Sequence, residues 1–360
     1  GAMPFSGGRA VVNTAPDYGS TYGLIDRSGK FVVEPVYNDI RLLGEGRAAL
    51  GIAADPAQPV IGSKYALADA ESGRLLTGFL FRSIGDFRFS LSSVSDDAHT
   101  YFIGTDGKPA PGLPRFSGDG TLALLGGGAV VQANVDRRIS YFNRDLGRTV
   151  WKENDVIPLA PPYTVKGYKY KPNPDYLVYY PQVSGIADPA AAERANVRLG
   201  ELAGVVPIPP GRLDYSYTGD FDVDWYRGSL VVLELSGYRY PWGAAHGMPS
   251  LVYANLNLKT GRIFELKDLF LPGSNYVETL SRIVGEQIRT DPQYDYVFPD
   301  TYKGIRPDQP FYVSDDALYL YFEPYEIAPY AAGFPTFRIP FADIGGLIDR
   351  NGEFWRAFHS

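Results

Sequence analysis

Three side chains could bring acid–base or metal chemistry to one place in this chain: His246, Glu323 and Glu326. An imidazole with two carboxylates can bind a divalent metal, and a pair of carboxylates is the catalytic device of glycosidases. His246 is the one histidine within a motif, so a metal site made of histidines alone is excluded. The sequence does not fix the separation of the two carboxylates. We therefore expect His246 to be a loop histidine that bonds to the backbone. Contact with a ligand is the second alternative, and a catalytic role is the third.

The usual catalytic and metal-binding motifs are missing. The chain has no cysteine, which excludes thiol nucleophiles, iron–sulfur clusters and cysteine zinc sites. It also lacks a Gly-x-Ser-x-Gly elbow and a His-Glu-x-x-His helix. Asp220, Asp222 and Asp224 begin like a calcium loop, but Trp225 and Val231 stand where glycine and glutamate are required. We predict no catalytic residue, no metal and no cofactor.

Aromatic side chains beside carboxylates favour binding instead. Tyr240 and Trp242 precede His246, while Tyr325 and Tyr330 follow Glu323. Tyrosine and tryptophan offer a large contact area with a polar tip, which suits both sugar stacking and protein interfaces. Ordinary packing in a core or sheet explains each ring equally well. The predicted ligand-binding residues are Tyr240, Trp242, His246, Glu323, Tyr325, Glu326 and Tyr330.

Charge and length limit the partners. The 360 residues include 34 basic and 41 acidic ones, so no cationic surplus is present and we expect no nucleic-acid partner. No window reaches the roughly 20 apolar residues of a membrane span. After residue 160 the chain has 21 of its 27 tyrosines and a net charge of −6, against −1 before it. Gly1-Ala2-Met3 looks like a protease-cleavage scar, so we expect a signal or anchor to have been removed.

The first half repeats with a period of about 40 residues. The glycine-rich stretch 5–12 recurs at 43–50 and 125–131, and a second signature begins at Tyr22, Tyr65, Tyr101 and Tyr141. In these signatures Asp, Gly and Lys lie between short apolar runs, which predicts β-hairpins. We expect about four such hairpin units, each burying one face against its neighbours.

These units resemble the WG-repeat family over residues 5–150. The best unit runs over 22–50 and includes the stretch Pro-Val-Tyr-Asn-Asp at 35–39. The other units depart from the pattern, because Ala66, Phe102 and Phe142 replace the glycine after tyrosine and no unit has the family's tryptophan. The resemblance implies a β-rich interaction scaffold and no known chemistry.

The second half mixes strands with helices. Asp188-Pro189 is typical of a helix start, and Val277, Leu280 and Val284 have helical spacing. Alternation at 221–225 and apolar runs at 229–235, 251–258, 318–322 and 337–339 predict strands. We predict an α+β protein: an N-terminal all-β repeat array of hairpins, and a C-terminal antiparallel sheet with two or three helices packed on one face. The predicted segments are a scar and tail (1–4), the repeat domain (5–157), a proline-rich linker (158–174), an α/β domain (175–348) and a C-terminal tail (349–360).

Five motifs follow one another in the second half, at 179–185, 243–247, 253–262, 266–270 and 322–333. With these motifs, residues 165–348 resemble the RsiV-like ectodomain family, with one departure, Ala244 in place of a family glycine. That family includes the extracytoplasmic part of a lysozyme-sensing anti-sigma factor, and a related segment accompanies peptidoglycan deacetylases. The resemblance implies a binding or sensing domain outside Gram-positive cells.

We therefore predict a non-catalytic cell-envelope protein, extracellular or at the cell surface, whose C-terminal domain binds a ligand. The ligand is a lysozyme-like protein or a cell-wall glycan, and the repeat array is a scaffold. A net charge of −6 would attract a basic protein, which favours the protein partner. The alternative is an envelope carbohydrate-active hydrolase or deacetylase that uses His246 with Glu323 or Glu326.

Overall fold

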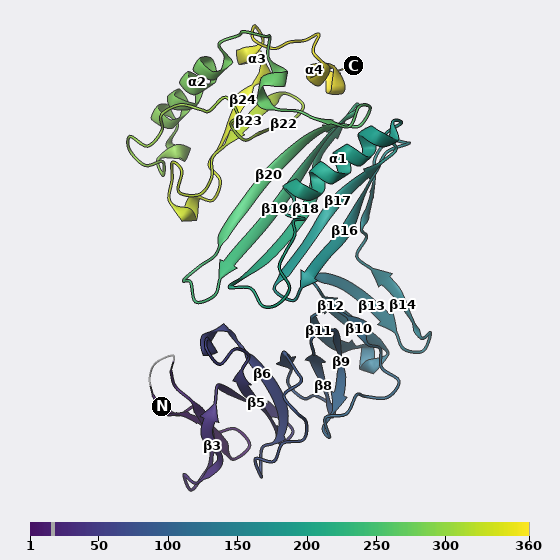
Figure 1. Cartoon of the computed structure of the whole chain (residues 1–360), viewed down its shortest axis with the longest axis vertical. Coiled ribbons are helices and arrows are strands. Elements are labelled where there is room, and N and C mark those ends of the chain that lie inside the picture. Colours follow the sequence, from purple (N-terminus) through teal and green to yellow (C-terminus); the bar gives the residue numbers. More distant parts are fainter. Residues whose placement is uncertain (16–18, 360) are drawn as a thin grey trace. The chain divides into compact units, whose positions relative to one another are not determined.

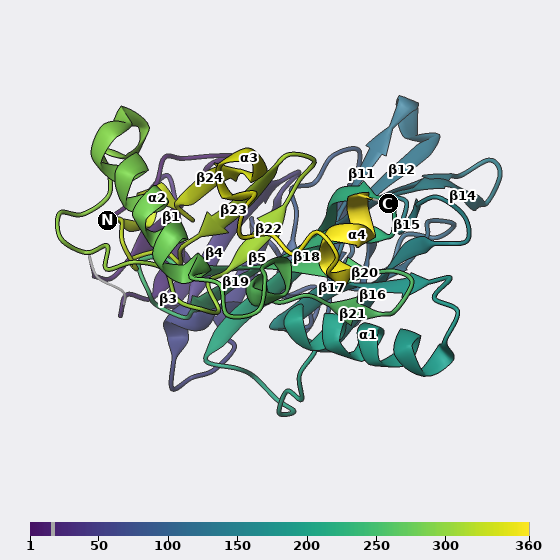
Figure 2. The same ribbon diagram turned by 90° about the horizontal axis from the view of Figure 1, so that it is seen from above.

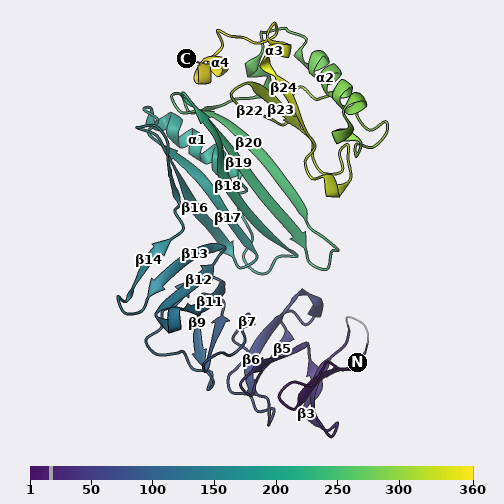
Figure 3. The same ribbon diagram turned by 180° about the vertical axis from the view of Figure 1, so that it is seen from behind.

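The computed structural model describes residues 1–15 and 19–359 and divides into two compact units, Gly1–Asn154 and Asp155–Ser360. We call them the N-terminal and C-terminal units. Figures 1, 2 and 3 show them from three sides. The predicted α+β class is confirmed, because strands dominate both units and all α-helices among the described residues lie in the C-terminal unit.

Four small antiparallel sheets make up the described part of the N-terminal unit, and each uses strands that are consecutive in the chain. Short 3₁₀ helices, η1 (Pro59–Ile61) and η2 (Gly126–Gly128), interrupt two of the connections. The sheets are β1–β3 (Arg9–Asn13, Tyr22–Asp26, Phe31–Tyr37), β4–β6 (Asp39–Gly44, Arg47–Ala53, Ser63–Asp69), β7–β10 (Ser83–Ile84, Leu91–Ser95, His99–Gly104, Phe116–Ser117) and β11–β14 (Gly120–Leu125, Val130–Val135, Arg138–Asn143, Arg148–Lys152).

Turns in this unit are closed by an aspartate side chain. The Oδ1 atom of Asp26 accepts hydrogen bonds from the backbone N–H of Ser28 (2.8 Å) and of Lys30 (3.1 Å). The Ser28 hydroxyl also donates to this atom (2.6 Å). That bond, followed by the two backbone bonds, lowers the pKa of Asp26. Asp69 receives equivalent backbone bonds, so the repeated aspartate is a turn device. The predicted hairpins are confirmed, and their signature is structural.

The N-terminal sheets stack, and strand β5 shows how. Ala48 and Leu50 face a core shared with β1–β3, whereas Ala49, between them, faces a core shared with β7–β9. Successive strand residues point to opposite faces, so this one strand contributes to two cores. A third small core joins Phe102 of β9 to Leu122 of β11. Each sheet is therefore covered by its neighbours rather than by helices.

A seven-stranded sheet forms the centre of the C-terminal unit. It is antiparallel except that β17 and β18 run parallel, because helix α1 carries the chain between them. Asp188 caps this helix through a bond from the Ala190 N–H (3.0 Å), as predicted. The elements are β15 (Val156–Pro158), β16 (Thr164–Asn173), β17 (Tyr176–Ser184), α1 (Pro189–Leu202), β18 (Tyr215–Arg227), β19 (Leu230–Pro241), β20 (Met248–Asn257) and β21 (Arg262–Ile263).

Strand β19 is buried on both faces over residues 230–233. Val231 and Leu233 of β19 face a core shared with Leu199 of α1, whereas Leu230 and Val232 face a second and larger core. Figure 1 shows α1 lying along the sheet and the C-terminal layer at one end of it. That layer contains η3 (Leu266–Leu269), α2 (Tyr276–Thr290), η4 (Pro292–Tyr294), β22–β24 (Phe311–Val313, Ala317–Tyr321, Thr336–Pro340), η5 (Tyr330–Ala332), α3 (Phe341–Ile344) and α4 (Glu353–His359).

The structure differs from three expectations. The helices do not share one face, because a second sheet, β22–β24, holds α2 on the side away from α1. Residues 158–174, expected as a linker, are mostly strand β16, which pairs with β17 from Thr164 to Tyr170 and again at Asn173, with an irregularity at Pro172. Residues 349–360, expected as a tail, include α4, whose Phe354 and Phe358 are fully buried.

Candidate functional site

One group of motif residues holds the scaffold together. The carboxylate of Glu353 in α4 accepts hydrogen bonds from Asn257 (2.9 Å), Thr260 (2.7 Å) and Arg262 (3.2 Å), all on or beside the β20–β21 turn. Burial alone would raise the pKa of Glu353, but these bonds outweigh it and lower the pKa. A Cβ atom on Gly261 would lie 2.7 Å from the carbonyl oxygen of Ala191 in α1. The motif at 253–262 therefore joins α1 and α4 to the sheet.

A second group of motif residues meets at the surface. The His246 ring lies against the Tyr330 ring with centroids 4.3 Å apart, and its Nε2 atom is 3.5 Å from the hydroxyl of Tyr325. Tyr325 and Tyr330 have ring centroids 5.8 Å apart. The imidazole comes from the loop between β19 and β20, and the two tyrosines come from the loop between β23 and β24. Segments about 80 residues apart thus form one exposed site, which we call the aromatic cluster.

Tyr238 completes this aromatic cluster. Its hydroxyl accepts a bond from the Gly247 N–H (2.9 Å), and a side-chain hydrogen bond joins it to Tyr330, which raises the pKa of the Tyr330 phenol. His246 Nδ1 lies 2.9 Å from the carbonyl oxygen of Gly247, as expected for a loop histidine bonded to backbone. Tyr238 is not among the predicted ligand-binding residues, although its i, i+2 spacing with Tyr240 places both on one face of β19.

Tyr240 and Trp242 use their polar atoms to hold the loop. The Tyr240 hydroxyl donates to the carbonyl of Ala244 (2.9 Å), and Trp242 Nε1 donates to the carbonyl of Leu213 (2.8 Å). Their rings meet edge to face at 6.0 Å. Both rings stay half-buried, so a ligand could contact their remaining surface.

The two glutamates have different surroundings. Glu326 bonds with Arg306 through one oxygen (2.5 Å) and accepts the backbone N–H of Glu323 with the other (3.0 Å), so it fastens its own loop. Glu323 instead lines a cavity of about 670 Å³ with Arg194 of α1 and Lys267 of η3. Burial, and then the charge of Glu326, raise the pKa of Glu323, while Arg306 opposes them.

The imidazole and the two carboxylates have different surroundings. Within residues 1–15 and 19–359, no ion pair joins His246 to Glu323 or Glu326, and no group of three or more histidine, aspartate or glutamate side chains could hold a metal ion. The arrangement offers exposed rings, one imidazole and hydroxyl groups. Such a surface can stack and hydrogen-bond a ligand.

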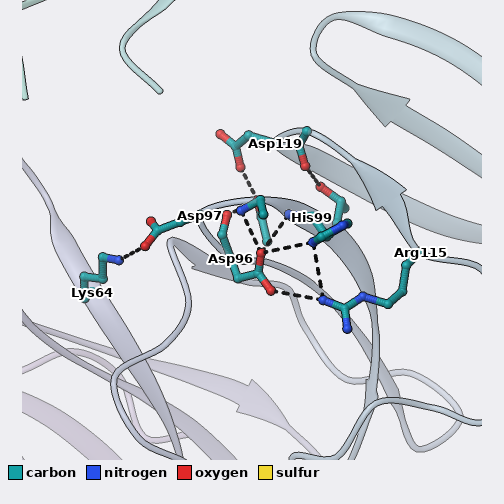
Figure 4. A network of polar contacts seen from close by, with 10 residues as sticks. Lys64, Asp96, Asp97, His99, Arg115 and Asp119 are labelled. Atoms are coloured by element: carbon teal, nitrogen blue, oxygen red, sulfur yellow. Dashed lines mark hydrogen bonds and ion pairs between the residues drawn. The ribbon is translucent and has the colours of Figure 1, made fainter. Parts of the chain in front are cut away.

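A polar network in the N-terminal unit surrounds a second histidine, His99 (Figure 4). Asp96 accepts the backbone N–H groups of Ala98 (2.8 Å) and His99 (2.7 Å) and pairs with Arg115 (3.4 Å). Burial would raise the pKa of Asp96, but these bonds prevail and lower it. Lys64 of β6 pairs with the adjacent Asp97. The network closes the β8–β9 turn and ties it to the preceding sheet.

Comparisons with known proteins match separate parts of the chain. Residues 22–50 match the family described as "WG containing repeat", and residues 267–342 match "Protein of unknown function (DUF3298)". The chain is 32% identical over 105 residues to the anti-sigma-V factor RsiV of Bacillus subtilis, covering 27% of this chain and 36% of that protein. Both predicted resemblances are confirmed. The chain spans about a third of the length of this curated relative.

Two solved structures of DUF3298 proteins are similar to this chain. One, from Bacteroides fragilis, is 17% identical and covers 58% of this chain and 100% of its own, with a TM-score of 0.41. The other, from Pseudomonas aeruginosa, is 21% identical and covers 56% of this chain and 97% of its own, also with a TM-score of 0.41. Among the described residues, no helix is long and apolar enough to cross a membrane.

Proposed function

We propose that the C-terminal unit is an extracytoplasmic ligand-binding domain of a cell-envelope protein and that the aromatic cluster contacts the ligand. The observation that carries this proposal is the meeting of His246 with Tyr325 and Tyr330 from loops far apart in sequence. Tyr325 keeps 51% of its surface exposed and has φ = +68°, a backbone conformation that side chains rarely adopt. Strained, exposed aromatic residues are typical of binding sites.

The partial match to an anti-sigma factor supports an extracytoplasmic location, at the cell surface or outside the cell. It also supports a sensing role, in which the domain responds to the binding of a ligand and does not catalyse a reaction. We propose a lysozyme-like protein as the ligand, ahead of a cell-wall glycan. The acidic balance after residue 160, a net charge of −6, would accelerate association with a basic protein.

Binding to two probes tests this proposal: a basic lysozyme immobilised for interferometry, and peptidoglycan sacculi for co-sedimentation. We expect the whole chain to bind lysozyme with an association rate that falls as salt is raised, because rim charges act mainly on association. The change Tyr238→Ala should weaken binding about 30-fold, the effect of removing an interface hot spot.

Tyr168→Ala is the matched control, because Tyr168 and Tyr238 lie in the same sheet and are both 38% exposed. We expect this control to bind like the unchanged chain. Equal losses in the two variants, or no binding of either probe, would contradict the proposal. Binding to sacculi alone, lost in Tyr238→Ala, would keep the site and replace the protein ligand by a glycan.

A further inference from the structure

The N-terminal unit contains a groove of about 930 Å³ outside the aromatic cluster. It lies between strand β11 and the β7–β8 region, and strands β8 and β11 are neighbours in Figure 1. Its lining includes the buried apolar residues Ile84, Phe102 and Leu122, of which Ile84 belongs to β7 and Leu122 to β11. The groove belongs to a single compact unit and is large enough for several side chains of a ligand.

One wall of the groove is the edge of a sheet. Strand β11 is the first strand of its sheet and pairs only with β12. The backbone N–H of Leu122 donates to the Ser93 hydroxyl (2.8 Å), so it points away from β12. The backbone groups of an antiparallel strand point to alternate sides from one residue to the next. The N–H and C=O groups of Leu124, two residues after Leu122, therefore also point away from β12. Outside its own ladder, Leu124 makes no backbone hydrogen bond with another described residue.

The groove is also cationic. Arg41, Arg88 and Arg144 line it, against the single carboxylate of Asp86. Arg144 donates one bond to the carbonyl of Gly128 (2.7 Å), and Arg41 donates to the carbonyl of Ile84, which leaves further N–H donors on each guanidinium. The Arg88 side chain is exposed and has no ion pair within the described residues. The three arginines can therefore bind carboxylates.

A strained turn holds an aromatic ring at the rim of the groove. Phe89 is 90% exposed and has φ = +54°, and Ser90 has φ = +60°. Arg88 and Leu91 exchange two backbone bonds across this turn (2.9 and 3.1 Å), and the carboxylate of Glu45 accepts the Ser90 N–H (3.1 Å). Two consecutive non-glycine residues in the left-handed region are costly, and strain of this kind marks ligand sites.

We propose that this groove binds an extended acidic peptide segment of a partner protein, which adds a strand to the edge of β11. The N–H and C=O groups of Leu124 would pair with the peptide backbone, the arginines would bind its carboxylates, and Phe89 would cover an apolar side chain. The open edge at Leu124 favours a peptide over a glycan, because only a peptide backbone offers amide N–H and C=O groups at the spacing of a strand.

Fluorescence anisotropy with labelled peptides of about eight residues, a common strand length, tests this proposal on the whole chain. The first probe alternates glutamate and valine, the second replaces each glutamate by lysine, and the third is the first probe fully N-methylated. We expect only the first to bind. The change Arg88→Glu should weaken its binding about tenfold, whereas Arg27→Glu, the same change on an exposed turn outside the groove, should not.

Phe89→Gly is a second variant that relieves the strained turn while removing the ring, so it should fold and still bind the first probe more weakly. The proposal is overturned if the lysine or N-methylated probe binds as well as the first. It is also overturned if Arg88→Glu and Arg27→Glu have equal effects, or if polyphosphate binds and no peptide does. None of these probes depends on the aromatic cluster, so the result is independent of the function proposed for the C-terminal unit.

Discussion

The two units bury their apolar side chains in opposite ways. In the N-terminal unit, short strands such as β5 contribute a few small side chains to each of two small cores. Turns of the hairpins are closed by hydrogen bonds to aspartate side chains. In the C-terminal unit, one long strand, β19, is covered on one face by α1 and on the other by a layer whose members lie up to about 130 residues further on. The first design depends on local turn chemistry and the second on distant contacts. Their stabilities should therefore respond to different substitutions.

The largest expected effects come from core truncation. Phe354→Ala removes a ring stacked on Phe264 at 4.3 Å and should destabilise the C-terminal unit by about 3–5 kcal/mol. Phe81→Ala removes a buried ring from a smaller core, so its effect on the N-terminal unit should lie near the lower end of that range. Scanning calorimetry should show that each change lowers only one of two unfolding transitions. A single transition that both changes shift would break the comparison between independent units.

Alanine at two glycines sharpens the same comparison. Gly261 and Gly29 both have positive φ, +71° and +82°, but a Cβ on Gly261 would collide with Ala191 while a Cβ on Gly29 meets nothing. We expect Gly29→Ala to lower the free energy of unfolding by about 1 kcal/mol through backbone strain. Gly261→Ala should lower it by about 2–3 kcal/mol, because in this variant α1 must also shift. Urea unfolding of the two variants measures the difference. Equal losses of stability would show that turn conformation, and not the packing of α1, determines the effect of both substitutions.

Acid should weaken the two units unequally. The lowered pKa of Glu353 means that its contribution is complete above its ordinary pKa of 4.5 and is lost as the pH falls through the lowered value. Glu353→Gln should therefore lower the free energy of unfolding by about 1 kcal/mol at neutral pH and by almost nothing in acid. The first value is reduced because Glu353 is partly exposed. Asp26 also has a lowered pKa, but its hydrogen bonds lie at an exposed turn, so Asp26→Asn should have a smaller effect with the same sign. Unfolding curves across the acid range compare the two variants, and a pH-independent loss for Glu353→Gln would refute the assigned bonds.

Local signals could be predicted from the sequence. Asp188 with Pro189 marks the start of α1, and Asp26 with Gly29 marks a hairpin turn, because both depend on atoms within a few residues. The sequence does not indicate helix α4, because seven residues carry little periodic signal and Phe354 packs against residues distant in sequence, such as Phe264.

The candidate site was less accessible to sequence reasoning. His246, Tyr325 and Tyr330 were selected as residues of motifs, but their contact depends on how β19, β20, β23 and β24 are placed. Nothing local singles out Tyr238, because its partner Tyr330 is about 90 residues away. Glu326 is a predicted ligand-binding residue, yet both its oxygens hold the chain, and its partner Arg306 is 20 residues away in sequence.

The burial of β19 on both faces has a consequence for biosynthesis. Helix α1 precedes this strand, so the Val231 face can be covered as soon as the strand leaves the ribosome. The Leu230 face must wait for residues through Phe358, which takes roughly 6–26 s at about 5–20 residues per second. During that interval Leu230 and Val232 stay exposed on an apolar strand, and exposed apolar strands promote aggregation. A holding chaperone during export or synthesis should therefore raise the yield of the C-terminal unit more than that of the N-terminal unit.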